Sequence, residues 1–201
     1  MSDEEVRKKR KYTDRERAAI LLDAERLGVV AGVATLVVGD PLDEATDVSA
    51  LISTSERDRV EAWVQEAAAA GATVAAGGRR QDDGVLLPTV ITGATPDMKV
   101  CAKEVFGPVV AITEYDTLDE AIALANDTEY GLQAAIFTRD IATALTAVRS
   151  LDFGGVLVNE VPTWRADQQP YGGLRDSGNT REGPAFTIKE MTEIRMVVIN
   201  G

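Results

Sequence analysis

The sequence predicts an α/β fold in which a mostly parallel, twisted sheet is flanked by helices. The chain has 201 residues, of which 45% are hydrophobic and 27% charged, the composition of an ordinary globular domain. From about residue 55 to residue 158, helical patterns alternate with short apolar runs. This alternation is typical of parallel strands joined by helices.

The first predicted element is a helix at residues 18–27. Thr13–Glu16 has the spacing of a capping box, and apolar residues then recur at helical intervals as far as Leu27. The valine-rich stretch 29–38 fits a second helix or a buried strand, because periodicity alone does not separate the two. Residues 40–54 are expected to form a connection.

Capping signals and apolar runs place the later elements. Ser55–Asp58 predicts the start of a helix that runs to Gly71, and Thr117–Glu120 predicts the start of the next. Two more helices are expected at residues 141–151 and 184–190. Short strands are predicted at residues 72–76, 85–92, 109–115, 132–138, 156–158 and 195–199.

The residue inventory limits the chemistry. The sequence contains no histidine, which excludes Ser–His and Cys–His nucleophile pairs and histidine-ligated zinc. Cys101 is the one cysteine, so an internal disulfide and a cysteine-cluster metal site are excluded as well. Any catalysis in this sequence would have to use carboxylates, lysine, tyrosine, serine or that thiol.

The charge is acidic and unevenly distributed. The net charge is −12, although Arg7–Lys11 is a run of five basic residues. Residues 12–201 hold 16 basic and 30 acidic residues, a net charge of −14, which disfavours nucleic acid or an anionic membrane as partner. Because the N-terminus lacks an apolar signal region and no run reaches about 20 apolar residues, we expect a cytoplasmic protein.

Six motifs occur in a fixed order and spacing along the chain: Gly39–Asp43, Met98–Val109, Asn126–Leu132, Phe137–Asp140, Gly155–Asn159 and Pro170–Gly178. Together they resemble the aldehyde dehydrogenase superfamily. The resemblance covers about residues 36–200 and implies the C-terminal part of that family's catalytic domain, without its Rossmann cofactor domain. We therefore expect residues 36–201 to be a partial catalytic domain and residues 1–35 a basic tail with an amphipathic helix of uncertain origin.

The Glu-x-Phe-Gly-Pro segment predicts part of a ligand site. It is expected to join two strands, with an unusual dihedral at Gly107, and to place a carboxylate and an aromatic ring at a strand end. The resemblance implies that Glu104 accepts hydrogen bonds from the nicotinamide ribose of NAD or NADP and that Phe106 packs nearby. The alternative is a surface glutamate and a core phenylalanine.

The resemblance implies that the loop after residue 159 forms one wall of an aldehyde pocket, with Thr163, Trp164 and Arg165 as its pocket residues. Trp164 offers an apolar wall. We hypothesise that Arg165 favours an anionic aldehyde carrying phosphonate, phosphate or carboxylate, because guanidinium binds oxyanions bidentately. The alternative is a solvated arginine that pairs with Asp167.

The parts that perform the family's chemistry are not found in this sequence. The resemblance implies a nucleophilic cysteine, an oxyanion-binding asparagine and a general-base glutamate, which precede the matched region. Cys101 does not lie where the family's nucleophile lies, and we expect it to be a small apolar residue on a strand. No catalytic residue is therefore assigned, no metal is expected, and the chain is predicted to be truncated and inactive alone.

The sequences at the two ends of the chain suggest macromolecular interaction partners. The strand at 195–199 resembles the family's oligomerisation strand and predicts a homo-oligomer or pairing with a full-length homologue, so a non-catalytic interaction module is the alternative function. Residues 9–27 resemble the opening helix of transposase-type helix-turn-helix proteins. Because no recognition helix follows, DNA binding is disfavoured.

Overall fold

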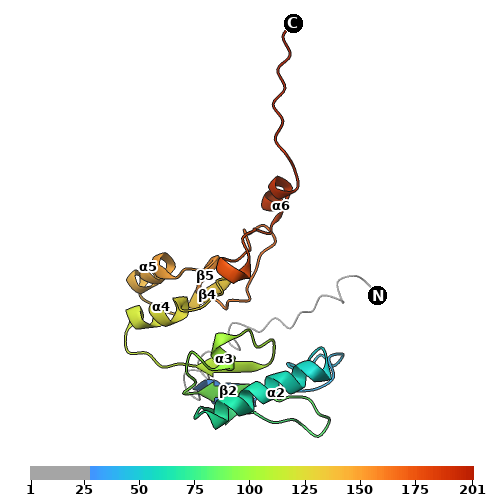
Figure 1. Ribbon diagram of the computed structural model, residues 1–201, viewed down its shortest axis with the longest axis vertical. Helices are drawn as coiled ribbons and strands as arrows, with labels where there is room; N and C mark the ends of the chain where they lie inside the picture. The colour runs from blue at the N-terminus through green and yellow to red at the C-terminus, as the bar shows by residue number, and fades with distance from the viewer. Residues whose placement is uncertain (1–27) are drawn as a thin grey trace. The chain divides into compact units, whose positions relative to one another are not determined.

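The structure is a computed structural model that describes residues 28–201 (Figure 1). The described chain forms two compact units, which divide between Glu114 and Tyr115. The predicted helix at 18–27, the basic run and the helix-turn-helix resemblance lie outside the described residues.

The first unit combines helices with a three-stranded sheet. Residues 28–34 are helical, whereas Val38 forms an isolated bridge with Val48, so the stretch 29–38 is a helix only in its first part. The further elements are α2 (Thr54–Ala69), β1 (Thr73–Ala76), β2 (Thr89–Thr92), α3 (Lys99–Ala102) and β3 (Val109–Ile112). In the sheet, β2 lies in the centre, antiparallel to β1 and parallel to β3.

The core of this unit lies between α2 and the sheet. Ser53 caps α2 by accepting a hydrogen bond from the Glu56 backbone N–H at 3.2 Å, so the cap lies two residues before the predicted one at Ser55. Val64 and Ala67 on the buried face of α2 pack with Ile91 of β2 and Val100 of α3. This packing anchors the segment that connects α3 to β3.

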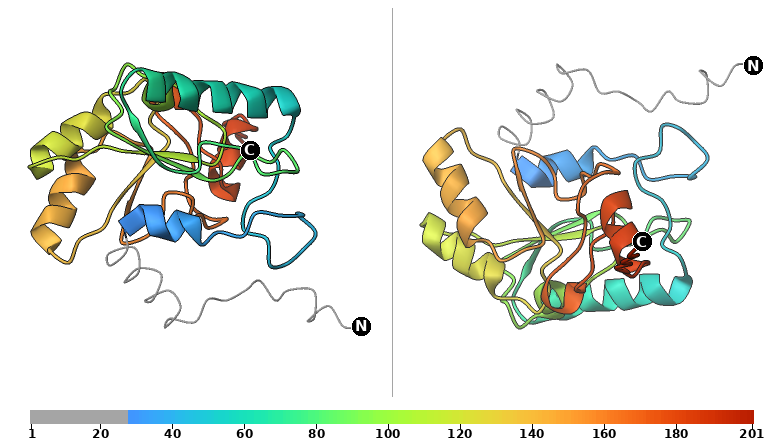
Figure 2. Two further views of the ribbon diagram at one scale, coloured as in Figure 1. Left: turned by 90° about the horizontal axis from the view of Figure 1, so that it is seen from below. Right: turned by 90° about the horizontal axis from the view of Figure 1, so that it is seen from above.

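The second unit has a two-stranded parallel sheet. Gln133 of β4 lies opposite Gly155 of β5, and α4 and α5 lie side by side (Figure 2). Thr117 and Asp140 cap the two helices, as local sequence chemistry favours. The elements are α4 (Leu118–Asn126), β4 (Gln133–Ile136), α5 (Ile141–Ser150), β5 (Gly155–Val158), the 3₁₀ turn η1 (Arg175–Ser177) and α6 (Pro184–Glu190).

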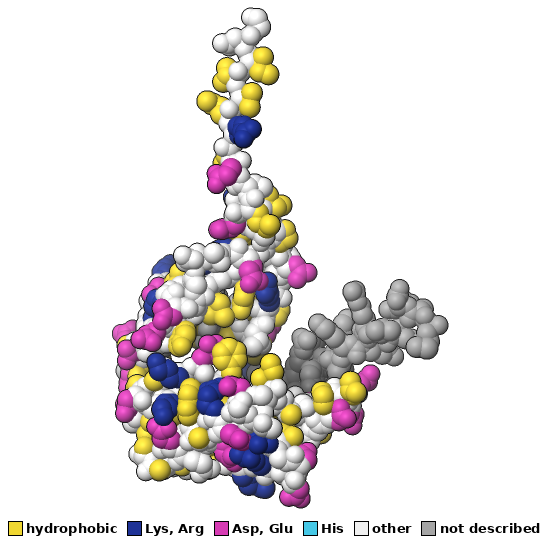
Figure 3. All heavy atoms as spheres, turned by 45° about the vertical axis from the view of Figure 1, so that its right-hand side comes forward, with side chains coloured by type: hydrophobic (Ala, Val, Ile, Leu, Met, Phe, Trp, Pro, Cys, Tyr) yellow, Lys and Arg dark blue, Asp and Glu magenta, His cyan; other side chains and the backbone are white. Residues whose placement is uncertain are grey.

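Two features differ from the predicted fold. The strands are distributed over two small sheets, and β1 pairs antiparallel with β2. The predicted strand at 195–199 is not formed, because a strand needs a hydrogen-bonded neighbour and none of the described residues supplies one. Its apolar side chains from Ile194 to Ile199 are exposed (Figure 3). Among residues 28–201, no helix is long and apolar enough to cross a membrane.

Candidate functional site

Glu104 and Phe106 lie in the loop between α3 and β3 rather than between two strands. Arg59 of α2 fixes this loop, because its Nη2 donates to the backbone oxygen of Val105 at 2.8 Å. The Arg59 guanidinium itself stacks on Trp63, 4.4 Å from the ring centroid. A side chain of α2 therefore holds the loop that carries Glu104 and Phe106.

The unusual dihedral of this loop belongs to Phe106, and the prediction of one at Gly107 is wrong. Phe106 has φ 46°, and its side chain is 74% exposed, so it is not a core phenylalanine. Gly107 instead allows close packing, since a Cβ there would lie 3.0 Å from Cγ1 of Val60 and would push that side chain away. Glu104 is also exposed and has no hydrogen-bond partner among the described residues.

Cys101 is on α3 and exposed, so the expectation of an apolar residue on a strand is wrong. A short helix forms there because the backbone N–H of Cys101 and that of Ala102 both bond the Met98 carbonyl. Partial burial and the nearby Asp97 carboxylate raise the pKa of the Cys101 thiol. The neutral thiol is therefore favoured over the nucleophilic thiolate.

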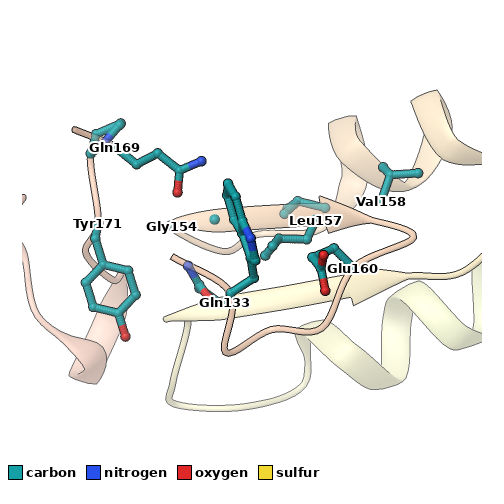
Figure 4. Close-up of a pocket in the computed structure, with 11 residues that line it drawn as sticks. Gln133, Gly154, Leu157, Val158, Glu160, Gln169 and Tyr171 are labelled. Atoms are coloured by element: carbon teal, nitrogen blue, oxygen red, sulfur yellow. The ribbon is translucent and has the colours of Figure 1, made fainter. Parts of the chain in front are cut away.

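A cavity of about 530 Å³ opens in the second unit, beside β5 and the loop that follows it (Figure 4). Its wall is largely apolar, with a few polar side chains directed toward it. The side chains that matter for the site are those of Gln133, Leu157, Glu160, Trp164, Gln169 and Tyr171. A concave apolar space with few polar groups is the usual form of a small-molecule site.

Glycines allow chain segments around this cavity to approach one another closely. A Cβ on Gly154 would lie 1.8 Å from the Gly172 carbonyl oxygen, and one on Gly155 would lie 3.2 Å from Cγ of Gln133. Oε1 of Gln133 is buried and has no hydrogen-bond partner among the described residues. Sequence patterns did not single out Gln133, because only the fold brings it to the cavity, and they included Tyr171 in the Pro170–Gly178 motif without giving it a role in the pocket.

Of the three predicted pocket residues, Trp164 alone lines the cavity. Thr163 is exposed and does not line it. Arg165 lies outside the lining, where its Nη2 bonds Oε2 of Glu182 at 2.5 Å and its guanidinium covers Tyr171 at 4.3 Å from the ring centroid. Arg165 therefore pairs with Glu182 and not with Asp167.

The described residues contain no cluster of three potential metal ligands. The site residues fall into two groups, with Glu104 and Phe106 in the first unit and the cavity with Trp164 and Arg165 in the second. Each group has the chemistry of a binding surface. The first offers a free carboxylate beside an exposed ring, and the second a cavity with a guanidinium at its margin.

Comparison with known proteins gives consistent matches. A model of the aldehyde dehydrogenase family matches residues 19–197, which begins before the predicted limit at residue 36. The 3-sulfolactaldehyde dehydrogenase of Priestia aryabhattai is 50% identical over 165 residues, 82% of this chain and 34% of that protein. A lactaldehyde dehydrogenase of Methanococcus aeolicus is 38% identical over 86% of this chain and 37% of that protein.

Solved structures agree with these sequence matches. Aldehyde dehydrogenase 21 from Physcomitrella patens, in complex with the reaction product succinate, matches with TM-score 0.81 and 40% identity, over 86% of this chain and 36% of that one. Betaine aldehyde dehydrogenase from Staphylococcus aureus, in complex with NAD+, matches with TM-score 0.77 and 36% identity, over 86% and 35%. The chain thus spans about a third of the length of the relatives that it matches.

Proposed function

Because the chain belongs to the aldehyde dehydrogenase family, we propose that it forms the C-terminal part of a catalytic domain that oxidises an aldehyde to a carboxylate. NAD or NADP, held in part by Glu104 and Phe106, would supply the hydride acceptor for this oxidation. The family match over residues 19–197 is the observation that carries this proposal. Within the domain, this chain contributes binding surfaces rather than the reacting groups.

The loop between α3 and β3 fits a role at the cofactor's ribose. The Glu104 carboxylate is exposed and accepts hydrogen bonds only, which suits a pair of ribose hydroxyls. The exposed Phe106 ring supplies an apolar surface beside it. Arg59, through its bond to Val105, keeps both side chains in one loop conformation.

On its own the chain is proposed to be inactive. Cys101 is the only thiol in the sequence, and its raised pKa disfavours the thiolate that attack on an aldehyde requires. The purified chain is therefore expected to produce no NADH absorbance when incubated with NAD+ and 3-sulfolactaldehyde. NADH formation that disappears after alkylation of Cys101 would overturn this part of the proposal.

The proposed substrate class is an aldehyde that carries an anionic group. Arg165 lies at the margin of the cavity, next to Trp164 in its wall. Two of the relatives fit this class by name, one acting on a sulfonated aldehyde and one binding the dicarboxylate succinate as its product. A guanidinium suits either group, because its N–H donors match carboxylate and sulfonate oxygens.

Binding by the intact chain tests this substrate class. Trp63 and Trp164 are the two tryptophans, so the Trp63→Phe variant reports the cavity through Trp164 fluorescence. We expect 2-hydroxyethanesulfonate to quench this signal at lower concentration than its neutral counterpart ethylene glycol. Arg165→Gln should weaken sulfonate binding about tenfold, the loss of one hydrogen bond to a charged group.

Arg139→Gln is the matched control, because it removes the same charge from an exposed loop outside the cavity lining. Equal binding of the sulfonate and of ethylene glycol would contradict an anion site. An equal loss of sulfonate affinity in Arg139→Gln and Arg165→Gln would show only an effect of net charge, and would contradict it too.

A second candidate function is a non-catalytic module that pairs with full-length relatives or with itself. The exposed apolar side chains of Ile194 to Ile199 favour it, because an extended apolar segment at a chain end can add to a sheet edge. Light scattering after gel filtration should show an oligomer that Val197→Lys converts to the monomer. A monomer at every concentration that does not co-purify with a full-length relative would contradict this candidate.

A further inference from the structure

Two groups hold the Arg165 guanidinium in place beside the cavity. Its Nη2 donates to the Glu182 carboxylate at 2.5 Å, and its planar face covers the Tyr171 ring. No other hydrogen bond of this guanidinium is formed within residues 28–201. An anionic ligand that binds Arg165 would therefore share the charge of this guanidinium with Glu182.

Backbone contacts fix the position from which Glu182 acts. The N–H of Glu182 donates to the Tyr171 carbonyl at 2.6 Å, and the N–H of Tyr171 donates to the Glu182 carbonyl at 3.2 Å. A Cβ on Gly172 would lie 2.1 Å from the Thr180 carbonyl oxygen, so the two segments meet more closely than side chains would allow. The pairing of these segments does not depend on the Glu182 side chain.

The guanidinium and the cavity share one wall. Tyr171 lines the cavity and also lies under Arg165, while Arg165 itself does not line the cavity. An anion that reaches Arg165 at the margin of the cavity thus meets an arginine already paired with a carboxylate. The side chains of the pair are 44% and 60% exposed, and ion pairs of this exposure are weak and exchange quickly.

We propose that Glu182 is a binding residue of the site that sets affinity, because its carboxylate competes with the anionic group of the ligand for Arg165. The competition lowers the affinity of every anion that binds this guanidinium. This inference rests on the proposed function, in which Arg165 receives the anion. It adds the residue that sets the strength of that contact.

The test compares sulfonate affinities in the Trp63→Phe background, with 2-hydroxyethanesulfonate as the probe. Glu182→Gln keeps the shape of the side chain and removes its charge, so it should tighten binding about threefold, within the range expected for an exposed ion pair. Glu66→Gln is the matched control. Glu66 forms a comparably exposed pair with Lys99, at 2.7 Å, in the first unit, so its loss changes net charge equally without touching Arg165.

A double variant separates competition from other effects. In the Arg165→Gln background, Glu182→Gln should leave sulfonate affinity unchanged, because no guanidinium is left to compete for. If Glu182→Gln fails to fold, Glu182→Asp keeps the charge but shortens its reach, and it should still bind the sulfonate more tightly than the parent. Circular dichroism establishes which variants are folded.

The two proposals fail in different ways. Affinity in Glu182→Gln that is no higher than in Glu66→Gln, while Arg165→Gln still loses about tenfold, overturns the role of Glu182 and leaves the anion site standing. Unchanged affinity in Arg165→Gln overturns the anion site itself, and with it the role of Glu182. Both proposals are supported if Glu182→Gln binds the sulfonate more tightly than the parent and this gain is absent from the variant that also carries Arg165→Gln.

Discussion

Two ionisable side chains show how the local environment sets chemistry at the scale of the residue. Burial, with Asp97 nearby, raises the pKa of the Cys101 thiol, whereas hydrogen bonds from Thr143 lower the pKa of the Asp140 carboxyl. In each case the surroundings favour one protonation state. The contributions of Asp97 and Thr143 come from groups within four residues of the titrating one, so they can be tested with single substitutions.

Cys101 should react slowly with iodoacetamide in the folded chain. Because the raised pKa lowers the thiolate fraction, the alkylation rate at mildly alkaline pH should be below that of the same chain unfolded in urea. Asp97→Asn should speed the reaction by removing a like charge. Mass spectrometry measures the rate without ambiguity, since the sequence has one thiol. A folded-state rate above the unfolded rate would contradict the expectation.

Asp140 should make the stability of the chain depend on pH in the acidic range. Its lowered pKa means that the carboxylate contributes stability above the ordinary value of 3.8, and that this contribution disappears as pH falls through the folded-state pKa. Asp140→Asn should lose that part of the acid sensitivity in urea denaturation. Thr143→Ala removes the hydroxyl that donates at 2.6 Å, and should move the NMR titration of Asp140 back toward 3.8.

At the scale of the element, β5 depends on a glycine that precedes it. Gly154→Ala would place a Cβ 1.8 Å from the Gly172 carbonyl oxygen, so the loop that walls the cavity would have to move. We expect a loss of about 3 kcal/mol in the free energy of unfolding, the upper range for overpacking. Urea denaturation followed by circular dichroism measures it.

Gly32→Ala is the matched control for that substitution. Gly32 lies in the helix at 28–34 and has nothing within 4 Å of its missing Cβ, so alanine there should stabilise the chain by roughly 0.5–1 kcal/mol. Equal effects of the two substitutions would show that the contact with Gly172 is unimportant.

Element positions followed largely from local sequence. The helix predicted at 184–190 is α6, and the cap predicted at Thr117 is the cap of α4, because capping depends on side chains within a turn. Contacts between distant residues were not predictable in this way. The pair of Arg165 and Glu182 spans 17 positions, and a nearer acid, Asp167, looked equally suitable. The packing role of Gly107 likewise depends on Val60 of α2, a contact that no local pattern contains.

At the scale of the whole molecule, the two units differ in the size of their cores. Large side chains such as Val60, Leu86 and Ile91 are fully buried in the first unit. In the second unit, the buried hydrophobic residues are Ala144 and Ala147 among those described. Since burial of apolar area is the main source of stability, the second unit should be the weaker one.

Unfolding should therefore begin in the second unit. Each unit contains one tryptophan, Trp63 in the first and Trp164 in the second. In the Trp63→Phe variant, the fluorescence of Trp164 follows unfolding of the second unit, and in Trp164→Phe the fluorescence of Trp63 follows the first. The urea midpoint should be lower in Trp63→Phe than in Trp164→Phe. Coincident midpoints in the two variants would show that the units unfold together and would contradict the expectation.

The backbone of Phe106 has a consequence for how this chain would respond to selection for stability alone. A residue with a Cβ at φ 46° costs roughly 1–2 kcal/mol that glycine would not. Phe106→Gly should thus raise the melting temperature while deleting the exposed ring beside Glu104. A thermostability screen is then expected to enrich this very change, at the cost of the exposed apolar ring that we propose as part of the cofactor surface.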